Sequence, residues 1–143
     1  MDLAAVMDEV GDLLDGIFAG RVFRHPPDGA VPPPAAIVTY PESIDFDATF
    51  ARGMDRIPDL PVIVLVGRVS ARAARTRLAA YVAGAGAKSV KATLEAPGQP
   101  TGGGYTAFDT LRVTSVAFDI VAFARVEHLA ATFTLDIAGT GAS

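Results

Sequence analysis

Apolar residues recur at intervals of three and four along residues 3–18, and acidic residues occupy the opposite side of this stretch. The apolar set is Leu3, Val6, Met7, Val10, Leu13, Leu14 and Ile17, and the acidic set is Asp8, Glu9, Asp12 and Asp15. This period matches one face of an α-helix. Residues 3–18 are therefore predicted to form an amphipathic helix that packs on a core with its apolar side.

A proline-rich stretch follows this helix. Residues 21–34 contain five prolines and one glycine, which cannot sustain a helix or a central strand, so they are predicted to be a loop or an extended connector. Residues 35–40 and 43–47 read as two short strands joined by a turn at Pro41-Glu42, which predicts a hairpin. Residues 48–61 show no clean period and are predicted to leave the sheet.

The most strongly apolar segment is residues 62–66, with the sequence Val-Ile-Val-Leu-Val. Such a run is typical of a strand covered on both faces, which predicts a central strand. Ser70 can cap a helix that ends at Val82, and Ser89 can cap a second short helix. In the first of these helices, Ala74, Leu78, Tyr81 and Val82 are expected to face inward. Residues 97–106, with two prolines and three consecutive glycines, are predicted to be a flexible loop without a packing role.

Residues 111–137 show strand-like alternation in two phases. Val113 belongs to one phase, while Val116, Phe118 and Ile120 belong to the other, which predicts a bulge near Thr114-Ser115. Alternation continues from residue 129 to residue 137, and residues 139–143 are predicted to be a disordered tail. Residues 1–143 are thus predicted to form a single α+β domain: a mixed, mostly antiparallel sheet of about five strands, with an N-terminal helix and one or two further helices packed on it.

Composition restricts the chemistry that this domain can perform. The absence of cysteine excludes disulfides, thiolate metal sites and cysteine nucleophiles. No apolar run approaches the ~20 residues of a membrane span, and acidic residues precede the first basic one, so the chain is expected to be soluble, unexported and without a membrane partner. His25 and His128 are the only imidazoles, and neither has an acid-base or metal-binding partner in the sequence. No catalytic, cofactor-binding or metal-ligating residue is predicted, and the chain is not expected to be an enzyme.

Charge is divided unevenly along the chain, whose net charge is −4. Residues 1–60 carry 11 acids and 4 bases, residues 61–91 carry 6 bases and no acid, and residues 92–143 carry 5 acids and 2 bases. A domain of this kind can present complementary faces to copies of itself, in head-to-tail contacts that close into rings. The alternative is pairing inside one domain, in which Arg72, Arg75 or Arg77 meets acids of the first helix.

An ordered set of short strings runs through nearly the whole chain after the helix and the proline-rich connector. The strings are Val38-Thr39-Tyr40-Pro41, Ile44-Asp45-Phe46-Asp47, Arg52-Gly53-Met54-Asp55-Arg56, Leu60-Pro61-Val62, Val64-Leu65-Val66-Gly67-Arg68, Ser89-Val90-Lys91 and Leu129-Ala130-Ala131-Thr132-Phe133. In this order they resemble the tail terminator proteins of siphophages that infect actinobacteria.

The resemblance implies a lambda-type tail terminator fold and a role in the virion, at the junction of tail and neck. It implies a hexameric ring, assembled in the host cytoplasm, that caps the tail tube, ends its polymerisation and offers a docking surface to a head completion or neck protein. DNA would pass through the lumen without specific binding, and a negative net charge suits such a channel.

The family supplies no motif residue to transfer, so the interface candidates come from the residues themselves. We expect the arginines of the second helix to meet acids of a neighbouring subunit, and two loops, 48–61 and 97–106, to contact the tube or the neck. The subunit-interface candidates are Arg72, Arg75, Arg77, Asp45, Asp47 and Asp55, and the partner-contact candidates are Arg52, Arg56, Gly102, Gly103, Gly104 and Tyr105.

Two alternatives remain open. One is a head-to-tail connector or neck subunit, which would also form a ring and lack chemistry. The other is a small ligand-binding or enzymatic α/β domain, which would need a deep pocket that gathers His25, His128 or several carboxylates.

Overall fold

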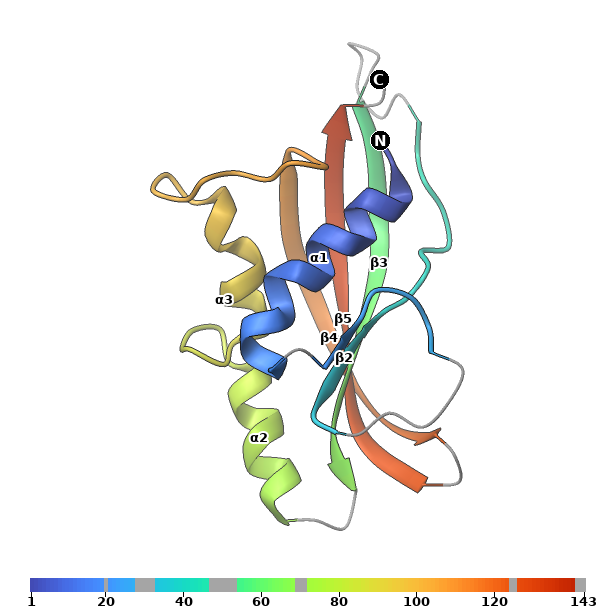
Figure 1. Cartoon of the computed structure of the whole chain (residues 1–143), viewed down its shortest axis with the longest axis vertical. Coiled ribbons are helices and arrows are strands. Elements are labelled where there is room, and N and C mark those ends of the chain that lie inside the picture. The colour runs from blue at the N-terminus through green and yellow to red at the C-terminus, as the bar shows by residue number, and fades with distance from the viewer. Residues whose placement is uncertain (20, 28–32, 47–53, 69–71, 124–125, 141–143) are drawn as a thin grey trace.

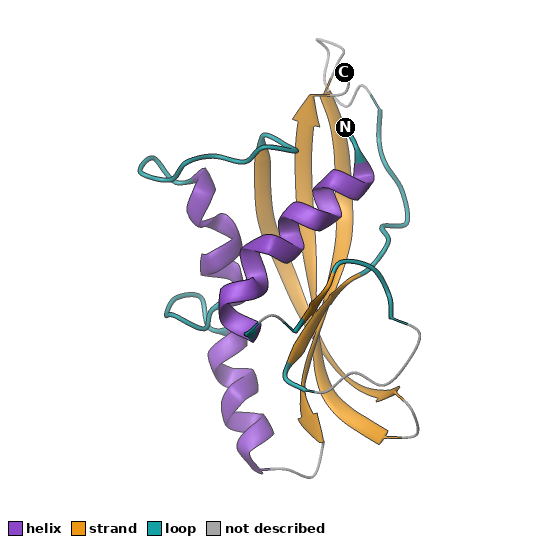
Figure 2. Ribbon diagram, in the orientation of Figure 1, coloured by secondary structure: helices purple, strands orange, loops and turns teal. Residues whose placement is uncertain are grey.

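A five-stranded sheet carries helices on one of its faces (Figure 1, Figure 2). The computed structural model describes residues 1–19, 21–27, 33–46, 54–68, 72–123 and 126–140. Within these ranges the helices are α1 (Leu3–Phe18), α2 (Arg72–Val82), α3 (Val90–Glu95) and the short 3-10 helix η1 (Ala96–Gly98). The strands are β1 (Val22–Phe23), β2 (Ala35–Val38), β3 (Met54–Arg68), β4 (Thr110–Phe123) and β5 (Val126–Thr140).

The strand order is β1-β2-β3-β5-β4, and only β1 and β2 run parallel to each other. The predicted α+β class, with an N-terminal helix and a mixed, mostly antiparallel sheet, is confirmed. None of the helices in the described ranges is both long enough and apolar enough to span a membrane.

Helix α1 forms where the spacing of apolar residues predicts it. The Asp2 carboxylate caps the helix by accepting hydrogen bonds from the backbone N–H groups of Ala4 and Ala5 at 3.0 and 3.4 Å. The apolar side is buried against the sheet, with Val6, Val10 and Leu14 fully covered. The helix ends at Phe18, whose ring stacks on Tyr81 of α2 with a centroid separation of 5.0 Å, so α1 and α2 are joined across the helical layer.

Strands β3 and β5 form the centre of the sheet. They pair from Met54↔Thr140 to Arg68↔His128, and β2 pairs with the other side of β3. Residues 62–66 therefore form part of a central strand, as predicted. On one side, Val62, Val64 and Val66 belong to the main core under the helices. On the other side, Leu65 packs with Ala130, Ala35 and Ile37 in a second, smaller cluster.

Three predictions around this centre are wrong. Residues 54–61 do not leave the sheet but form the first half of β3. The register shifts between Ile57 and Leu60, and this shift accommodates Pro58-Asp59 while Ile57 and Leu60 stay fully buried. Residues 35–40 and 43–47 do not form a hairpin, since β2 pairs with β3 and β1, and residues 43–46 contribute only an isolated bridge between Asp45 and Arg56. The tail is ordered further than predicted, because Gly139 and Thr140 end β5. Residues 47–53 and 141–143 lie outside the described ranges.

The predicted bulge in β4 is confirmed. The pairing of β4 with β5 shifts between Val113 and Ser115. Before the shift, Val113 lies opposite Leu135, and after it Val116 and Phe118 lie opposite Phe133 and Ala131. These three β5 partners are alternate residues of one strand, so their side chains point to the same face. The bulge therefore keeps Val113, Val116 and Phe118 all on the helix-covered face, although they belong to two phases of β4.

The segment between α2 and β4 is better packed than its sequence predicts. Residues Ala74 and Tyr81 of α2 are buried, Leu78 and Val82 are partly buried as expected, and the predicted cap Ser70 lies outside the described ranges. The loop 97–106 does have a packing role: Tyr105 donates a hydrogen bond to the Leu94 carbonyl at 2.6 Å and lies against Phe108, with ring centroids 4.6 Å apart.

The Ser89 cap of α3 provides a test of this part of the fold. Its hydroxyl accepts a hydrogen bond from the Ala92 N–H at 3.1 Å and donates one to the Ala83 carbonyl, and the residue is fully buried. Replacing Ser89 by Ala is expected to lower the free energy of unfolding by about 1 to 2 kcal/mol, because two buried groups lose their partner. Chemical denaturation measures this, with the exposed Ser115→Ala as a matched control that should change stability little. Equal stability of both variants and the wild type would contradict the cap.

Candidate functional site

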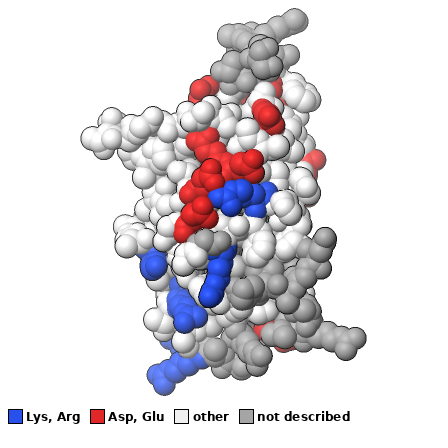
Figure 3. All heavy atoms as spheres, viewed as in Figure 1, with Lys and Arg blue, Asp and Glu red and all other residues white. Residues whose placement is uncertain are grey.

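The arginines of α2 form the main charged surface that the sequence predicts. Arg72, Arg75 and Arg77 are all exposed, and none makes a hydrogen bond or an ion pair with another residue of the described ranges. Burial raises the pKa of the Tyr81 phenol, and the positive charge of Arg77 opposes this shift. Figure 3 shows basic side chains over α2, separated from an acidic group that follows α1.

Three of the four acids of α1 have partners in the described residues, and none of these partners lies in α2. Arg24 reaches both Asp12 and Asp15, with its Nη2 atom 2.9 Å from Asp15 Oδ2, and these contacts raise the pKa of Arg24, the hydrogen bond to Asp12 most. Its side chain crosses α1 at Gly11, where an added Cβ would lie 2.6 Å from Arg24 Cγ. The intramolecular alternative, with α2 arginines paired to α1 acids, is therefore not what the described residues show.

The three candidate interface acids differ in position. Asp45 is exposed, and its backbone bridges to Arg56 through hydrogen bonds of 2.7 and 2.8 Å. Asp55 is only 4% exposed, and its Oδ2 atom accepts a hydrogen bond from the N-terminal ammonium group at 3.2 Å. Asp55 is thus buried and paired within the chain at the start of β3, and its contact with an arginine of another subunit stays a prediction. Asp47 lies outside the described ranges.

Arg56 is already engaged within the chain. Its Nε and Nη2 atoms donate to the two carboxylate oxygens of Asp136 at 2.9 and 2.8 Å, in the fork geometry that suits arginine and carboxylate. This hydrogen bonding raises the pKa of Arg56. A partner would have to compete with Asp136 for this side chain. The other arginine proposed for this loop, Arg52, lies outside the described ranges.

The loop 97–106 is anchored at both of its ends. At its start, the Pro97 carbonyl accepts a hydrogen bond from the Gly104 N–H at 2.8 Å, and Gly102 passes so close that an added Cβ would lie 2.3 Å from the Ala96 carbonyl oxygen. At its end, the Glu9 carboxylate accepts hydrogen bonds from the backbone N–H groups of Thr106 and Ala107. Tyr105 is partly buried and hydrogen-bonded within the fold, and its role as a partner contact stays a prediction. Gly102, Gly103 and Gly104 remain exposed.

The two histidines occupy different environments. His25 is exposed after β1, and its Nδ1 atom lies 3.3 Å from the carbonyl oxygen of Pro26. His128 is 5% exposed in the interior strand β5. Its Nδ1 atom is buried without a hydrogen-bond partner in the described structure. The described ranges contain no group of three or more His, Cys, Asp or Glu side chains placed to hold a metal ion.

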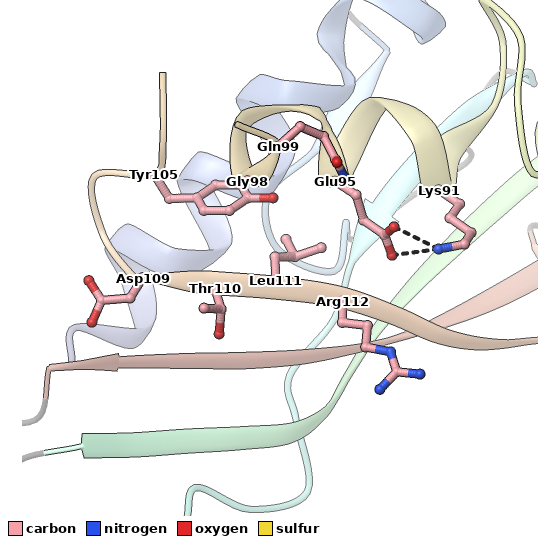
Figure 4. Close-up of a pocket in the computed structure, with 9 residues that line it drawn as sticks. All are labelled: Lys91, Glu95, Gly98, Gln99, Tyr105, Asp109, Thr110, Leu111 and Arg112. Atoms are coloured by element: carbon pink, nitrogen blue, oxygen red, sulfur yellow. Dashed lines mark hydrogen bonds and ion pairs between the residues drawn. The ribbon is translucent and has the colours of Figure 1, made fainter. Parts of the chain in front are cut away.

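Two of the hollows on the surface of the described residues lie beside α3 and α1. The larger, of about 320 Å³, lies between α3 and the start of β4, and Figure 4 shows Lys91, Glu95 and Arg112 around it. The smaller, of about 230 Å³, lies between α1 and the segments that hold His25 and Tyr40. The smaller hollow holds His25 beside Asp8, the larger holds Glu95 and Asp109, and His128 lines neither of them.

Glu95 joins α3 to β4 at the larger hollow. Its carboxylate accepts two hydrogen bonds from Lys91 Nζ, at 2.6 and 2.8 Å, and one from the Val113 N–H at 2.8 Å. Burial favours the neutral acid, but the hydrogen bonds and the positive charges of Lys91 and Arg112 outweigh it, so the pKa of Glu95 is lowered. The contacts are structural, because they satisfy a backbone N–H on the outer side of β4.

Large apolar side chains on the surface are the feature that sequence reasoning missed. They are Tyr40, Phe46, Phe118 and Ile120, which are 61%, 72%, 58% and 52% exposed. The alternation in β4 correctly gives Phe118 and Ile120 the phase of the helix-covered face. It carries no information about how far the helical layer reaches, and both residues lie beyond it.

No family model, no curated protein sequence and no solved structure gives a significant match to this chain.

The lowered pKa of Glu95 predicts a pH-dependent contribution to stability. A carboxylate whose folded pKa lies below its unfolded value stabilises the fold above the unfolded pKa, and this contribution is lost as the pH falls through the folded value. Glu95→Gln is therefore expected to reduce the free energy of unfolding by about 1 kcal/mol at pH 7, and by less below about pH 4. Denaturation curves at pH 7 and pH 3 measure this difference, with the exposed Glu127→Gln as control. A deficit that is the same at both pH values would exclude the charge of Glu95 as its cause.

Proposed function

We propose that this chain is a structural subunit of a virion that assembles into a ring and acts as a tail terminator. The observation that carries the proposal is the cluster of exposed arginines on α2 that lack ion-pair partners in the described ranges. Arg24 and Arg56, by contrast, are paired with acids of the same chain. An unpaired cluster of one sign, apart from an acidic region, favours head-to-tail contacts between identical subunits.

The resemblance to siphophage tail terminators supplies the rest of the proposal. The ring, a hexamer in that family, would cap the last ring of the tail tube, end its growth and present a surface to a head completion or neck protein. DNA would pass through its lumen without specific binding, and a net charge of −4 agrees with weak phosphate capture. A neck or connector subunit would form a similar ring, so the choice of binding partner separates the two.

The proposal is tested by mixing the purified protein with polymerising tail tube protein and examining tube ends by electron microscopy. Tubes that are shorter than those formed without the protein, each carrying a ring at one end, are the expected result, because a bound ring blocks further addition. Tubes of unchanged length, together with binding to portal or adaptor rings, would contradict the terminator role and support a neck subunit.

The charge contact is tested by reversing one arginine. Arg75→Glu is expected to weaken ring formation by about tenfold while the free energy of unfolding stays unchanged, because the side chain is exposed and unpaired and its reversal replaces attraction by repulsion. Sedimentation of the protein together with tail tubes measures how much of it forms a ring at the tube ends. The control is Lys88→Glu, which makes the same charge change at an exposed position after α2. If Arg75→Glu assembles as the wild type does, Arg75 is not part of the contact.

A further inference from the structure

The smaller hollow, which we call the α1 hollow, combines apolar groups, an aromatic ring and a carboxylate. Leu3, Ala4 and Met7 of α1 line it with apolar groups, and Asp8 of the same helix lies beside them. The Tyr40 side chain, which is 61% exposed, lines it from the segment after β2. The helical residues come together because positions 3, 4, 7 and 8 share one side of a helix. A carboxylate next to apolar and aromatic groups suits a cation that is carried on an apolar stem.

The Asp8 carboxylate is available to such a cation. Asp8 is exposed, and no residue of the described ranges pairs with its side chain. It begins a line of three carboxylates on α1, since Asp12 follows it by four residues and Asp15 by seven. Arg24 spans the other two, because its Nη2 atom contacts Asp12 and lies 2.9 Å from Asp15 Oδ2. One guanidinium is thus shared by two of the three carboxylates, and Asp8 is the carboxylate that it leaves unpaired.

Arg24 shows how an arginine side chain binds to this side of α1. Its stem crosses the helix at Gly11, where an added Cβ would lie 2.6 Å from Arg24 Cγ, and its guanidinium reaches the carboxylates beyond. Arg24 also lines the α1 hollow, but Asp12 and Asp15 together offset its single positive charge. The hollow therefore still attracts a second cation at Asp8, one helical turn before the carboxylates that Arg24 occupies.

The size of the α1 hollow and its lining favour the side chain of an arginine. Its volume of about 230 Å³ lies below the roughly 300 to 1,000 Å³ of pockets that enclose a whole small molecule. The guanidinium group is planar, stacks on aromatic rings and binds carboxylates in a fork, whereas the ammonium group of lysine is a compact and strongly hydrated charge. The methylenes of an arginine stem can also cover apolar surface. Because one exposed ion pair contributes little by itself, such a site acts as one anchor within a protein contact.

The arginines of α2 can supply this side chain only from another copy. They are exposed and unpaired within the described ranges, and they are Arg72, Arg75 and Arg77. Helices α1 and α2 meet through Phe18 and Tyr81, near the last residue of each helix, and extend from there in different directions (Figure 1). At 1.5 Å per residue, Asp8 lies about 15 Å from this contact along α1, and Arg75 about 9 Å from it along α2. The α1 hollow and the α2 arginines therefore stay apart within one chain.

We propose that the α1 hollow binds the side chain of an arginine from α2 of a second copy of this chain. The guanidinium group pairs with the Asp8 carboxylate and lies on the Tyr40 ring, while the methylenes of the stem cover Leu3 and Met7. The contact joins two different surfaces of the chain, which is the head-to-tail kind that a ring requires. The inference rests on the proposed ring for the source of the arginine, and it identifies α1 as the acidic side of the contact.

The site itself is tested with a small probe, N-acetyl-L-arginine N-methylamide, by NMR titration of the whole chain. The amide signals of Ala4, Met7 and Asp8 are expected to shift and to saturate with a Kd of about 10 mM, because a single side chain binds weakly. The matched probe is the citrulline analogue, which has nearly the same shape but no charge and should bind about fivefold more weakly. Equal binding of the two probes would exclude the ion pair, and shifts that do not saturate by about 100 mM would exclude the site.

A pair of variants assigns the ion pair to Asp8. Asp8→Asn should bind the arginine probe about fivefold more weakly than the wild type does, at an unchanged unfolding midpoint, since its side chain is exposed and unpaired. Glu42→Gln is the control, because it removes the same charge at an exposed position two residues from Tyr40 but outside the lining of the hollow. If both variants lose the same affinity, the effect is one of net charge and Asp8 is not the partner.

The source of the arginine is tested by concentrating the protein without a probe. The amide signals of Ala4, Met7 and Asp8 should move as the concentration rises to about 1 mM, and they should stay fixed when all three α2 arginines are replaced by Gln. Signals that do not depend on concentration, or that still move in the triple variant, would overturn a second copy as the source.

The tube-capping experiment decides the proposed function separately. If the wild type and Asp8→Asn cap tubes equally well, this contact is rejected and the terminator role is kept. If the protein self-associates through Asp8 but leaves tubes uncapped, the contact is kept and the terminator role is rejected.

Discussion

The antiparallel pairing of β3 with β5 is the interaction on which the rest of the structure depends. It runs from Met54 to Arg68 along β3 and joins residues 60 or more positions apart in the chain. Because Val62, Val64 and Val66 face the helices and Leu65 faces the other side, this pair supplies apolar residues to both faces of the sheet. It also fixes the order of the remaining strands: β2, followed by β1, adds beside β3, and β4 adds beside β5, so β4 is an edge strand.

Elements with a clear period could be predicted from the sequence, and elements defined by long-range pairing could not. Helix α1, the Ser89 cap and the β4 bulge depend on neighbouring residues, so local spacing is enough to identify them. Pro58-Asp59 has the composition of a turn, yet it lies within β3, because burial of Ile57 and Leu60 against β5 outweighs the local preference of two residues. The false hairpin at 35–47 has the same cause, since β2 pairs with β3 instead.

The candidate site was predictable in chemistry but only partly in position. Sequence identifies the α2 arginines, whose exposure follows from a helix with few apolar positions, but it cannot show that Asp55 is buried or that His128 is in an interior strand. Alternation likewise assigns Phe118 to the correct face of β4, and the exposure of that residue arises because the helical layer ends before it. The face to which a strand residue points is set by the local alternation of the strand, whereas its burial depends on elements elsewhere in the chain.

The exposed charge on α2 has a consequence for the assembly of the proposed ring. A few exposed side chains and solvated ion pairs give a weak contact between two copies, since surface ion pairs contribute about 1 kcal/mol or less. A ring closes with one contact more than an open chain of the same subunits, and that last contact forms at high effective concentration. Weak pairs and a stable ring are therefore compatible, and a tube end that aligns the subunits favours the closed form. In the proposed ring, exposed arginines on α2 suit this requirement better than a fully paired cluster, because unpaired charges are available to a neighbouring subunit.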